Sequence, residues 1–349
     1  MKTVFVKIAL NIVLIFFISN KLYSNAAQPG IWNAGGTVFT MLHPEDSLSF
    51  KKVQMQQEQI YIQLYKGFAV VKGVYWFRNT TKDRLQFKMG YPVNGIYDGG
   101  ETNLNQVSID SLNEFKIKAK GNWLPLLKQS YPELNNNDKN PIPFSENWKV
   151  WEMTFQPNEI QIVEVYFIVN TNNAQVRKGY NVDKKNVFIY LLESGSVWQS
   201  PIENAAFYVQ LMDGLLPTDI NGISTGFNFK YSEKHKLFIG EKHNFSPTPK
   251  DNLVISYHNK EDEFLFKKKL SNTNALYLSI DSLRTLPKNG ILLKKIDLGN
   301  PYAVKTNFSG FLPILLTYFV MYLPGIIIAI LIILFIRYML KRRKLKINS

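Results

Sequence analysis

Apolar and polar positions alternate along much of the chain, and such alternation is typical of β-strands with one buried face. In residues 59–65, for example, Ile60, Ile62 and Leu64 share one face. A Lys-Gly turn at positions 66–67 predicts an antiparallel hairpin with the next apolar run, and a polar turn at positions 79–83 predicts a second hairpin. We expect strands at residues 59–65, 68–77, 85–91, 148–155, 160–169, 187–192, 205–212, 224–231, 236–240, 253–257 and 263–270.

The predicted strands fall into two clusters, separated by a polar bridge at residues 170–178. Closely spaced strands with Gly, Asn and Pro turns are typical of β-sandwiches. We therefore predict a mainly β fold with two antiparallel, immunoglobulin-like sandwich domains, at residues 27–172 and 173–270. Residues 271–310, with one short strand expected at 276–280, would form a juxtamembrane segment, and helix patterns are nearly absent before residue 311.

Residues 311–336 break the alternation with 26 consecutive uncharged residues, and a basic run from Arg337 to Lys346 follows. At about 1.5 Å per residue, a helix of this length reaches ~39 Å, which exceeds a hydrocarbon core of ~30 Å. Pro324-Gly325 lies at the midpoint and predicts a kink, because proline lacks a backbone donor. We predict a transmembrane helix at residues 311–336, in contact with the lipid bilayer, and a basic cytoplasmic tail at residues 337–349.

The N-terminus has the pattern of a secretory signal peptide. Lys2 and Lys7 precede an apolar stretch at residues 8–18, and Ser24-Asn25-Ala26 places small residues where a signal peptidase inspects them. We predict a signal peptide at residues 1–26, and an uncleaved anchor is the alternative. With the C-terminal helix, this predicts a single-pass protein of the cytoplasmic (inner) membrane whose N-terminal part is periplasmic or extracellular.

Charge and cysteine content narrow the possible functions. The net charge is +14, but three basic residues fall in residues 1–26 and six in residues 337–349, so the predicted exported part carries +5. Membrane topology therefore accounts for much of the basic excess, and we expect no nucleic-acid partner. The absence of cysteine excludes disulfides and thiolate metal sites. With a composition rich in Lys, Asn and Ile, it suggests a bacterial origin.

Residue patterns for catalysis are scarce in this chain. The four histidines, at positions 43, 235, 243 and 258, lack the spacing of a zinc site, and no G-x-S-x-G elbow or glycine-rich phosphate loop is present. We therefore predict no enzyme activity and no cofactor. Asp98 and Glu101 are weak candidates for metal ligands, but a solvated turn explains them better because the alternating acidic spacing of a calcium loop is missing.

Tryptophan side chains are the candidates for a ligand or partner surface, because aromatic rings stack on sugars and anchor protein interfaces. The four candidates are Trp123, Trp148, Trp151 and Trp198. The alternative is that these rings belong to the core, and for Trp198 we favour a position covering the end of a sandwich. Both interpretations stay open on the sequence alone.

Four short motifs stand out among the strands: Gly35-Gly36-Thr37-Val38-Phe39, the run from Phe68 to Thr80, Gly90-Tyr91-Pro92, and the run from Tyr190 to Ile202. They resemble a family of bacterial exported proteins known only as a domain of unknown function. The hairpin with Asn79 and Pro92 also resembles, more loosely, the β domain of vault proteins and inter-alpha-trypsin inhibitors. Tyr91, Ser194 and Ser200 depart from the family pattern. The resemblance implies an exported β-rich fold and transfers no activity and no site residue.

These observations favour a non-catalytic binding or scaffold protein of the bacterial cell envelope, with an envelope protein or a cell-wall glycan as its partner. One alternative is a glycan- or peptidoglycan-binding module that uses Trp123, Trp148 or Trp151. Another is an enzyme with an unfamiliar site. Each alternative depends on which side chains the fold exposes together.

Overall fold

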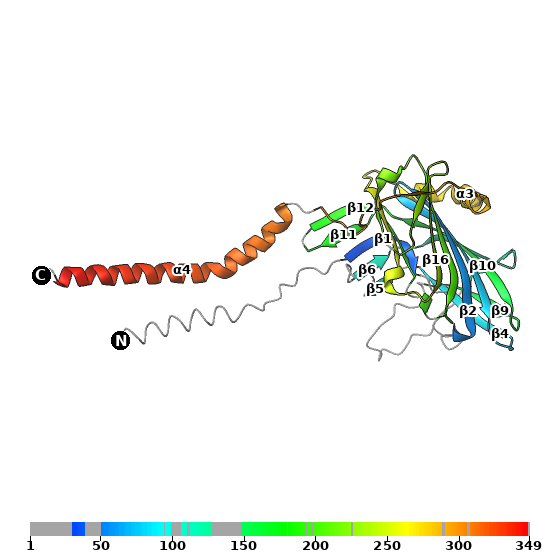
Figure 1. Cartoon of the computed structure of the whole chain (residues 1–349), viewed down its shortest axis with the longest axis horizontal. Helices are drawn as coiled ribbons and strands as arrows, with labels where there is room; N and C mark the ends of the chain where they lie inside the picture. Colours follow the sequence, from blue (N-terminus) through cyan, green and yellow to red (C-terminus); the bar gives the residue numbers. More distant parts are fainter. Residues whose placement is uncertain are drawn as a thin grey trace. The chain divides into compact units, whose positions relative to one another are not determined.

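A computed structural model of the chain describes residues 30–38, 50–93, 95–98, 106–109, 112–127, 148–179, 181–192, 195–196, 198–224, 226–287, 290–305 and 308–347. This part is mainly β, as predicted (Figure 1). The chain divides into two compact units. One comprises Pro29–Arg177 and Val182–Val304 and is called the β unit below. The other comprises Met1–Gln28, Lys178–Asn181 and Lys305–Ser349.

A nine-stranded sheet forms one layer of the β unit. In spatial order its strands are β18 (Lys294–Lys295), β15 (Lys230–Ser232), β16 (Leu237–Phe245), β13 (Ile202–Leu211), β2 (Val53–Tyr65), β3 (Phe68–Asn79), β10 (Ile160–Asn170), β7 (Asn113–Ala119) and β8 (Asn122–Trp123). Neighbouring strands are antiparallel, except that β13 and β2 run parallel. The predicted hairpin is confirmed as β2 and β3, joined by the turn at residues 66–67.

A seven-stranded sheet forms a second layer. Its strands, in spatial order, are β14 (Ile220–Ile223), β17 (Leu253–Asn259), β12 (Asn181–Leu191), β11 (Gln175–Lys178), β1 (Gly30–Val38), β6 (Gln106–Ile109) and β5 (Gly95–Asp98). Strand β1 runs parallel to both β12 and β6. A Cβ atom on Gly36 would lie 2.1 Å from the carbonyl oxygen of Ile189. Glycine is therefore required where β1 approaches β12.

A two-stranded sheet consists of β4 (Leu85–Pro92) and β9 (Trp148–Phe155) (Figure 1). The second predicted hairpin is therefore wrong, because β3 pairs with β10 and β4 pairs with β9. The polar turn at residues 79–83 is a corner between sheets. Asn79 fixes this corner, since its side-chain amide donates to the carbonyl oxygens of Asp83 and Gln156, at 2.7 and 2.9 Å. A local sequence pattern does not distinguish such a corner from a hairpin turn.

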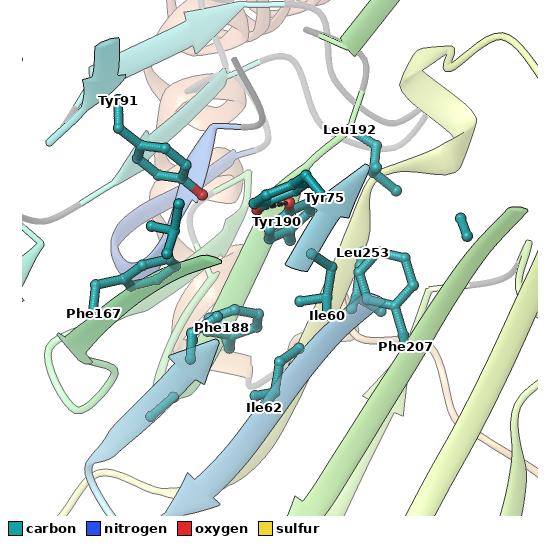
Figure 2. Packing of buried hydrophobic residues seen from close by; sticks show 14 of the residues in the cluster. Ile60, Ile62, Tyr75, Tyr91, Phe167, Phe188, Tyr190, Leu192, Phe207 and Leu253 are labelled. Atoms are coloured by element: carbon teal, nitrogen blue, oxygen red, sulfur yellow. Dashed lines mark hydrogen bonds between the residues drawn. The ribbon is translucent and has the colours of Figure 1, made fainter. Parts of the chain in front are cut away.

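The three sheets share one hydrophobic core. Figure 2 shows Tyr75 of β3 and Tyr190 of β12 meeting in this core, with Tyr91 of β4 directed toward them. The hydroxyls of Tyr75 and Tyr190 are 2.8 Å apart, so a buried hydrogen bond joins the two large sheets. The sheets surround one common core, and the two predicted immunoglobulin-like sandwiches are not confirmed.

The structure differs from the predicted pair of domains divided at residue 172. The nine-stranded sheet takes β2, β3 and β10 from before this position and β13 and β16 from after it, and all of them belong to the β unit. The cause is the parallel pairing of β2 with β13, which joins segments 147 residues apart. The predicted juxtamembrane segment also contributes to the β unit up to Val304, and Tyr302 is buried in it.

Two helices replace predicted strands at residues 263–270 and 276–280. They are α2 (Phe266–Leu270) and α3 (Thr273–Thr285). In α3 the buried residues Tyr277, Ile280 and Leu283 recur every three residues or so, which is a helical spacing. They pack against the face of the nine-stranded sheet that points away from the shared core. Single turns of 3₁₀ helix, η2 (Phe50–Lys52), η5 (Pro217–Asp219) and η6 (Pro249–Asp251), lie in the connections.

The other unit contains α4 (Phe308–Ile347), a helix of 40 residues that includes Pro313 and Pro324. Its stretch Phe311–Arg342 has a mean hydropathy of 3.0, and none of the described residues in the most apolar part of it is buried. It is therefore long and apolar enough to cross a membrane. The helix contains the predicted span at residues 311–336 and continues through the basic residues after it. The predicted signal peptide at residues 1–26 lies outside the described residues.

Candidate functional site

A cleft of about 810 Å³ lies where the turn between β2 and β3 meets α2 and the start of α3. Tyr65 and Phe68 flank this turn and stack, with ring centroids 4.4 Å apart. The ring of Phe264 extends the stack, 6.2 Å from that of Phe68. We call these three lining residues the aromatic floor of the cleft. Tyr65 and Phe68 sit at strand ends and Phe264 lies in a connection, so the meeting of these three rings depends on the tertiary fold.

Gly67 makes the aromatic floor possible. Its φ of +92° lies in the left-handed region, where residues with a side chain are strained. A Cβ atom at this position would lie only 2.6 Å from the ring of Phe264. The turn that was predicted from Lys66-Gly67 therefore has a second role, because it leaves room for an aromatic ring from a distant segment.

The segment that carries Phe264 is held in place by Asn172. The backbone N–H of Glu261 donates to Asn172 Oδ1 at 2.8 Å, and Asn172 Nδ2 donates to the Glu261 carbonyl oxygen at 2.7 Å. Asn172 is buried, and the two hydrogen bonds are partly shielded from water. In addition, His258 Nε2 lies 3.2 Å from Glu261 Oε1. These contacts fix one side of the cleft to the connection that follows β10.

Charged side chains of both signs line the cleft. One of them, Glu261, is paired with His258. The other four are Asp213 after β13, Glu263 before α2, and Lys268 and Lys269 of α2. Within the described part of the chain, none of these four side chains forms an ion pair. Lys269 Nζ does lie 5.9 Å from the centroid of the Phe68 ring, as in a cation–π contact. The cleft thus combines aromatic surface with charges that remain available to a ligand.

The structure separates the four candidate tryptophans. Trp151 and Trp198 are buried in the shared core, at 0% and 1% exposure, so they provide no surface. Trp148 is half-buried at the start of β9. Trp123 is 56% exposed and lines a smaller hollow of about 340 Å³ with Phe115, Ile117 and other residues of this edge of the sheet. Of the four, Trp123 is the one available for stacking on a ligand.

The surroundings of Trp123 add to this second candidate surface. Its ring lies 5.5 Å from that of Tyr166, and Lys118 Nζ lies 5.9 Å from its centroid. Of the two candidate metal ligands, the structure describes Asp98. Asp98 is the last residue of β5, and Glu101 lies outside the described residues, so a metal site there stays a prediction.

A buried carboxyl group lies inside the core, away from both surfaces. Glu58 of β2 faces Tyr75 across the β2–β3 pair and is fully buried. Neither of its carboxyl oxygens has a hydrogen-bond partner among the described residues. Burial raises the pKa of Glu58 to about 8 and that of Tyr91 to about 12. Glu58 is therefore mostly protonated at neutral pH.

No protein-family model and no curated protein matches this chain. Among solved structures, it is similar to a proposed nutrient-binding protein of Legionella pneumophila, with 15% identity and a TM-score of 0.45 over 77% of this chain and 94% of that one.

Two further similarities are to longer enzymes. An M1 zinc metallopeptidase of Deinococcus radiodurans shares 8% identity, with a TM-score of 0.29 over 59% of this chain and 42% of that one. The yeast LTA4 hydrolase shares 9% identity, with a TM-score of 0.34 over 60% of this chain and 29% of that one. The chain thus spans less than half of either enzyme, and similarity at these levels carries no argument about function.

Proposed function

We propose that this chain is a non-catalytic binding protein of a bacterial cell envelope, anchored in the cytoplasmic membrane by α4, with its β unit exported. The observation that carries the proposal is the cleft beside α3. Its volume of about 810 Å³ lies within the range of ~300–1,000 Å³ that is usual for small-ligand sites. Its aromatic floor and its available charges are the two features that such sites use for affinity and orientation.

The lining of the cleft favours binding over catalysis. Its described lining residues include no histidine, and the chain contains no cysteine. The hydroxyl of its serine, Ser271, donates to the carbonyl oxygen of Lys268 at 2.8 Å, which is a local structural contact. The position of the cleft at the junction of a hairpin turn, two helices and a fixed connection also provides a preformed shape, which lowers the entropic cost of binding.

Filling the cleft with Ser271→Trp is expected to abolish ligand binding without unfolding the protein, because Ser271 is exposed on the cleft wall. The full-length protein would be tested by thermal shift against short peptides, muropeptides and glycan strands of the cell wall. A ligand at a hundred times its Kd should stabilise the wild type by about 2.7 kcal/mol. The stabilisation should vanish in Ser271→Trp.

Ser282→Trp is the matched control for this variant. Ser282 is also exposed, lies on α3, and donates to the carbonyl oxygen three residues before it, at 2.6 Å, just as Ser271 does. Ligand stabilisation should be unchanged in Ser282→Trp. A ligand whose effect persists in Ser271→Trp would show that the cleft is not its site, and a panel without any stabilising ligand would count against the binding function.

A glycan-binding function at Trp123 is the second candidate, supported by the exposure of this ring beside its own hollow. The apolar face of a sugar can stack on an exposed aromatic ring, and this contact contributes to affinity. If this candidate is correct, Trp123→Ala should remove the stabilisation by cell-wall glycans, whereas Ser271→Trp should preserve it. The opposite result would assign the glycan to the cleft.

The proposed topology predicts a simple labelling pattern, because the natural chain contains no cysteine. Single-cysteine variants Ser271→Cys and Ser349→Cys would be treated with a membrane-impermeant maleimide in intact spheroplasts. We expect Ser271→Cys to be labelled directly and Ser349→Cys to be labelled only after permeabilisation. Labelling of Ser349→Cys in intact spheroplasts would contradict a cytoplasmic C-terminus.

A further inference from the structure

We infer that the ligand of the cleft is a short peptide with free termini and an aromatic or large aliphatic side chain. This inference rests on the proposed function, since it takes the cleft to be the binding site, and it names the chemical class of the ligand. Three features of the lining support it: the aromatic floor, the two lysines of α2, and the two carboxylates on the connections around them.

The aromatic floor favours a ligand with a flat or bulky apolar group. Tyr65, Phe68 and Phe264 form a continuous stack in which Tyr65 and Phe68 are buried and Phe264 is partly exposed. An additional ring or a leucine side chain would extend the stack at Phe264. The side chain of Leu265 lines the same cleft and is 67% exposed, so it gives further apolar surface that a bound side chain would cover. Burial of such surface is the main source of affinity in small-ligand sites.

The lysines of α2 supply the partner for a negative end group. Lys268 and Lys269 both line the cleft, and neither forms an ion pair with another described residue. A carboxylate that enters the cleft would gain charge-assisted hydrogen bonds from one or both ammonium groups. Lys269 lies above the ring of Phe68, which places positive charge next to the aromatic floor.

The two carboxylates supply the partner for a positive end group. Asp213 and Glu263 lie on different connections, one after β13 and one before α2, and both line the cleft. Burial raises the pKa of Tyr65, a hydrogen bond with Ser279 opposes this, and the charge of Asp213 raises it again. Asp213 and the aromatic floor line the same cleft, so an ammonium group paired with Asp213 would share the cleft with a stacked side chain.

Charges of both signs around one apolar surface distinguish a peptide from other small ligands. A neutral sugar would leave all four charged groups without an ionic partner, and covering them would cost desolvation energy. An anion alone would meet the lysines but also the carboxylates, which repel it. A peptide with a free amino end and a free carboxyl end satisfies both pairs, and its middle side chain meets the aromatic floor.

The test is isothermal titration calorimetry of the full-length protein in detergent micelles with the tripeptides Ala-Phe-Ala and Ala-Leu-Ala. Each peptide would also be used with an acetylated amino end and with an amidated carboxyl end. We expect the free peptides to bind and each blocking group to weaken binding by about tenfold or more, because each removes a charged hydrogen-bonding partner. The binding heat should be lost in Ser271→Trp.

Charge-neutralising variants test which charged residues of the cleft bind each end of the peptide. The double variant Lys268→Gln/Lys269→Gln should no longer distinguish the amidated from the free peptide. The double variant Asp213→Asn/Glu263→Gln should no longer distinguish the acetylated from the free peptide. The matched control is Lys82→Gln/Asp83→Asn, which neutralises one charge of each sign in the turn that follows β3, at its end away from the cleft. This control should bind all peptides as the wild type does.

The outcomes separate this inference from the proposed function. Equal affinity for free and blocked peptides, or binding heat that persists in Ser271→Trp, would overturn the peptide assignment. If neither tripeptide binds while another ligand stabilises the protein in a manner sensitive to Ser271→Trp, the assignment is wrong and the binding function stands. If no ligand acts through the cleft, both are wrong.

Discussion

Glu58→Gln is expected to stabilise the protein by about 3 kcal/mol at pH 7. The pKa of Glu58 is raised from 4.5 to about 8 by burial in the core, so the folded protein holds a proton that the unfolded chain releases at neutral pH. Stability from this group is fully present below pH 4.5, falls as the pH rises, and is fully lost above about pH 8. Glutamine has a similar shape and no proton to release, so it removes this loss.

The measurement is chemical unfolding of the full-length protein in micelles, followed by tryptophan fluorescence at several pH values. The gain from Glu58→Gln should be below about 1 kcal/mol at pH 5 and about 3 kcal/mol at pH 7, because each pH unit between the two pKa values contributes ~1.4 kcal/mol. Glu152→Gln, an exposed glutamate of β9, is the control and should show no such slope. An equal gain at pH 5 and pH 7 would exclude proton uptake as the cause.

Lys72→Met is expected to destabilise the protein by about 3 kcal/mol and to weaken ligand binding in the cleft. Lys72 Nζ is 3.0 Å from Glu164 Oε2 and 2.5 Å from Asp281 Oδ1, and its side chain is only 3% exposed. Arg284 Nη1 also lies 2.5 Å from Glu164 Oε1. These groups join β3 and β10 to α3. Removal of the lysine leaves Glu164 with less compensation in a largely buried position, which is costly.

The effect on the cleft follows from the position of α3, whose first turns line it. Denaturant unfolding would measure the stability, and calorimetry would measure the affinity. Lys116→Met is the matched control, because Lys116 also reaches from the sheet to α3 but forms no ion pair there among the described residues: it makes an exposed hydrogen bond of 3.4 Å with Asn274 and lies 5.6 Å from the ring centroid of Tyr277. It should cost less than about 1 kcal/mol. If both variants cost the same, the buried network does not hold α3.

The same network predicts a loss of stability in acid. Burial raises the pKa of Glu164, but the hydrogen bonds and charges of Lys72 and Arg284 outweigh this effect, so its pKa lies below the ordinary value. The resulting stability is present above the ordinary pKa of a glutamate and is lost as the pH falls through the lowered value. The two glutamates therefore have opposite effects on the pH dependence of stability. Glu58 lowers stability as the pH rises above mildly acidic values, and Glu164 lowers it as the pH falls below them.

Local sequence patterns predicted the strands well where the partner strand is close in sequence. The hairpin of β2 and β3 is an example, since the alternation around Ile60 and the turn at Gly67 both lie within the two strands. The corner at Asn79 has the same polar composition as a hairpin turn, and the difference lies in a partner, Gln156, 77 residues away. Such partners leave no trace in a local pattern.

The cleft was missed for a related reason. Residues 263–270 were predicted to form a strand, but α2 occupies residues 266–270, and Lys268 and Lys269 of this helix line the cleft. The spacing of Tyr277, Ile280 and Leu283 indicates a helix at residues where a short strand was predicted. The meeting of Phe264 with Gly67 could not be predicted, since it depends on the tertiary fold.

The parallel pairing of β2 with β13 also has a consequence for how the chain acquires its fold. During synthesis β2 leaves the ribosome 147 residues before its register partners in β13, and only its β3 edge can pair early. The opposite edge offers open backbone donors and acceptors in the meantime, which is a site for aggregation. Closure of so long a loop gives a high contact order and slow folding. We therefore expect the nascent protein to depend on a chaperone that shields this edge.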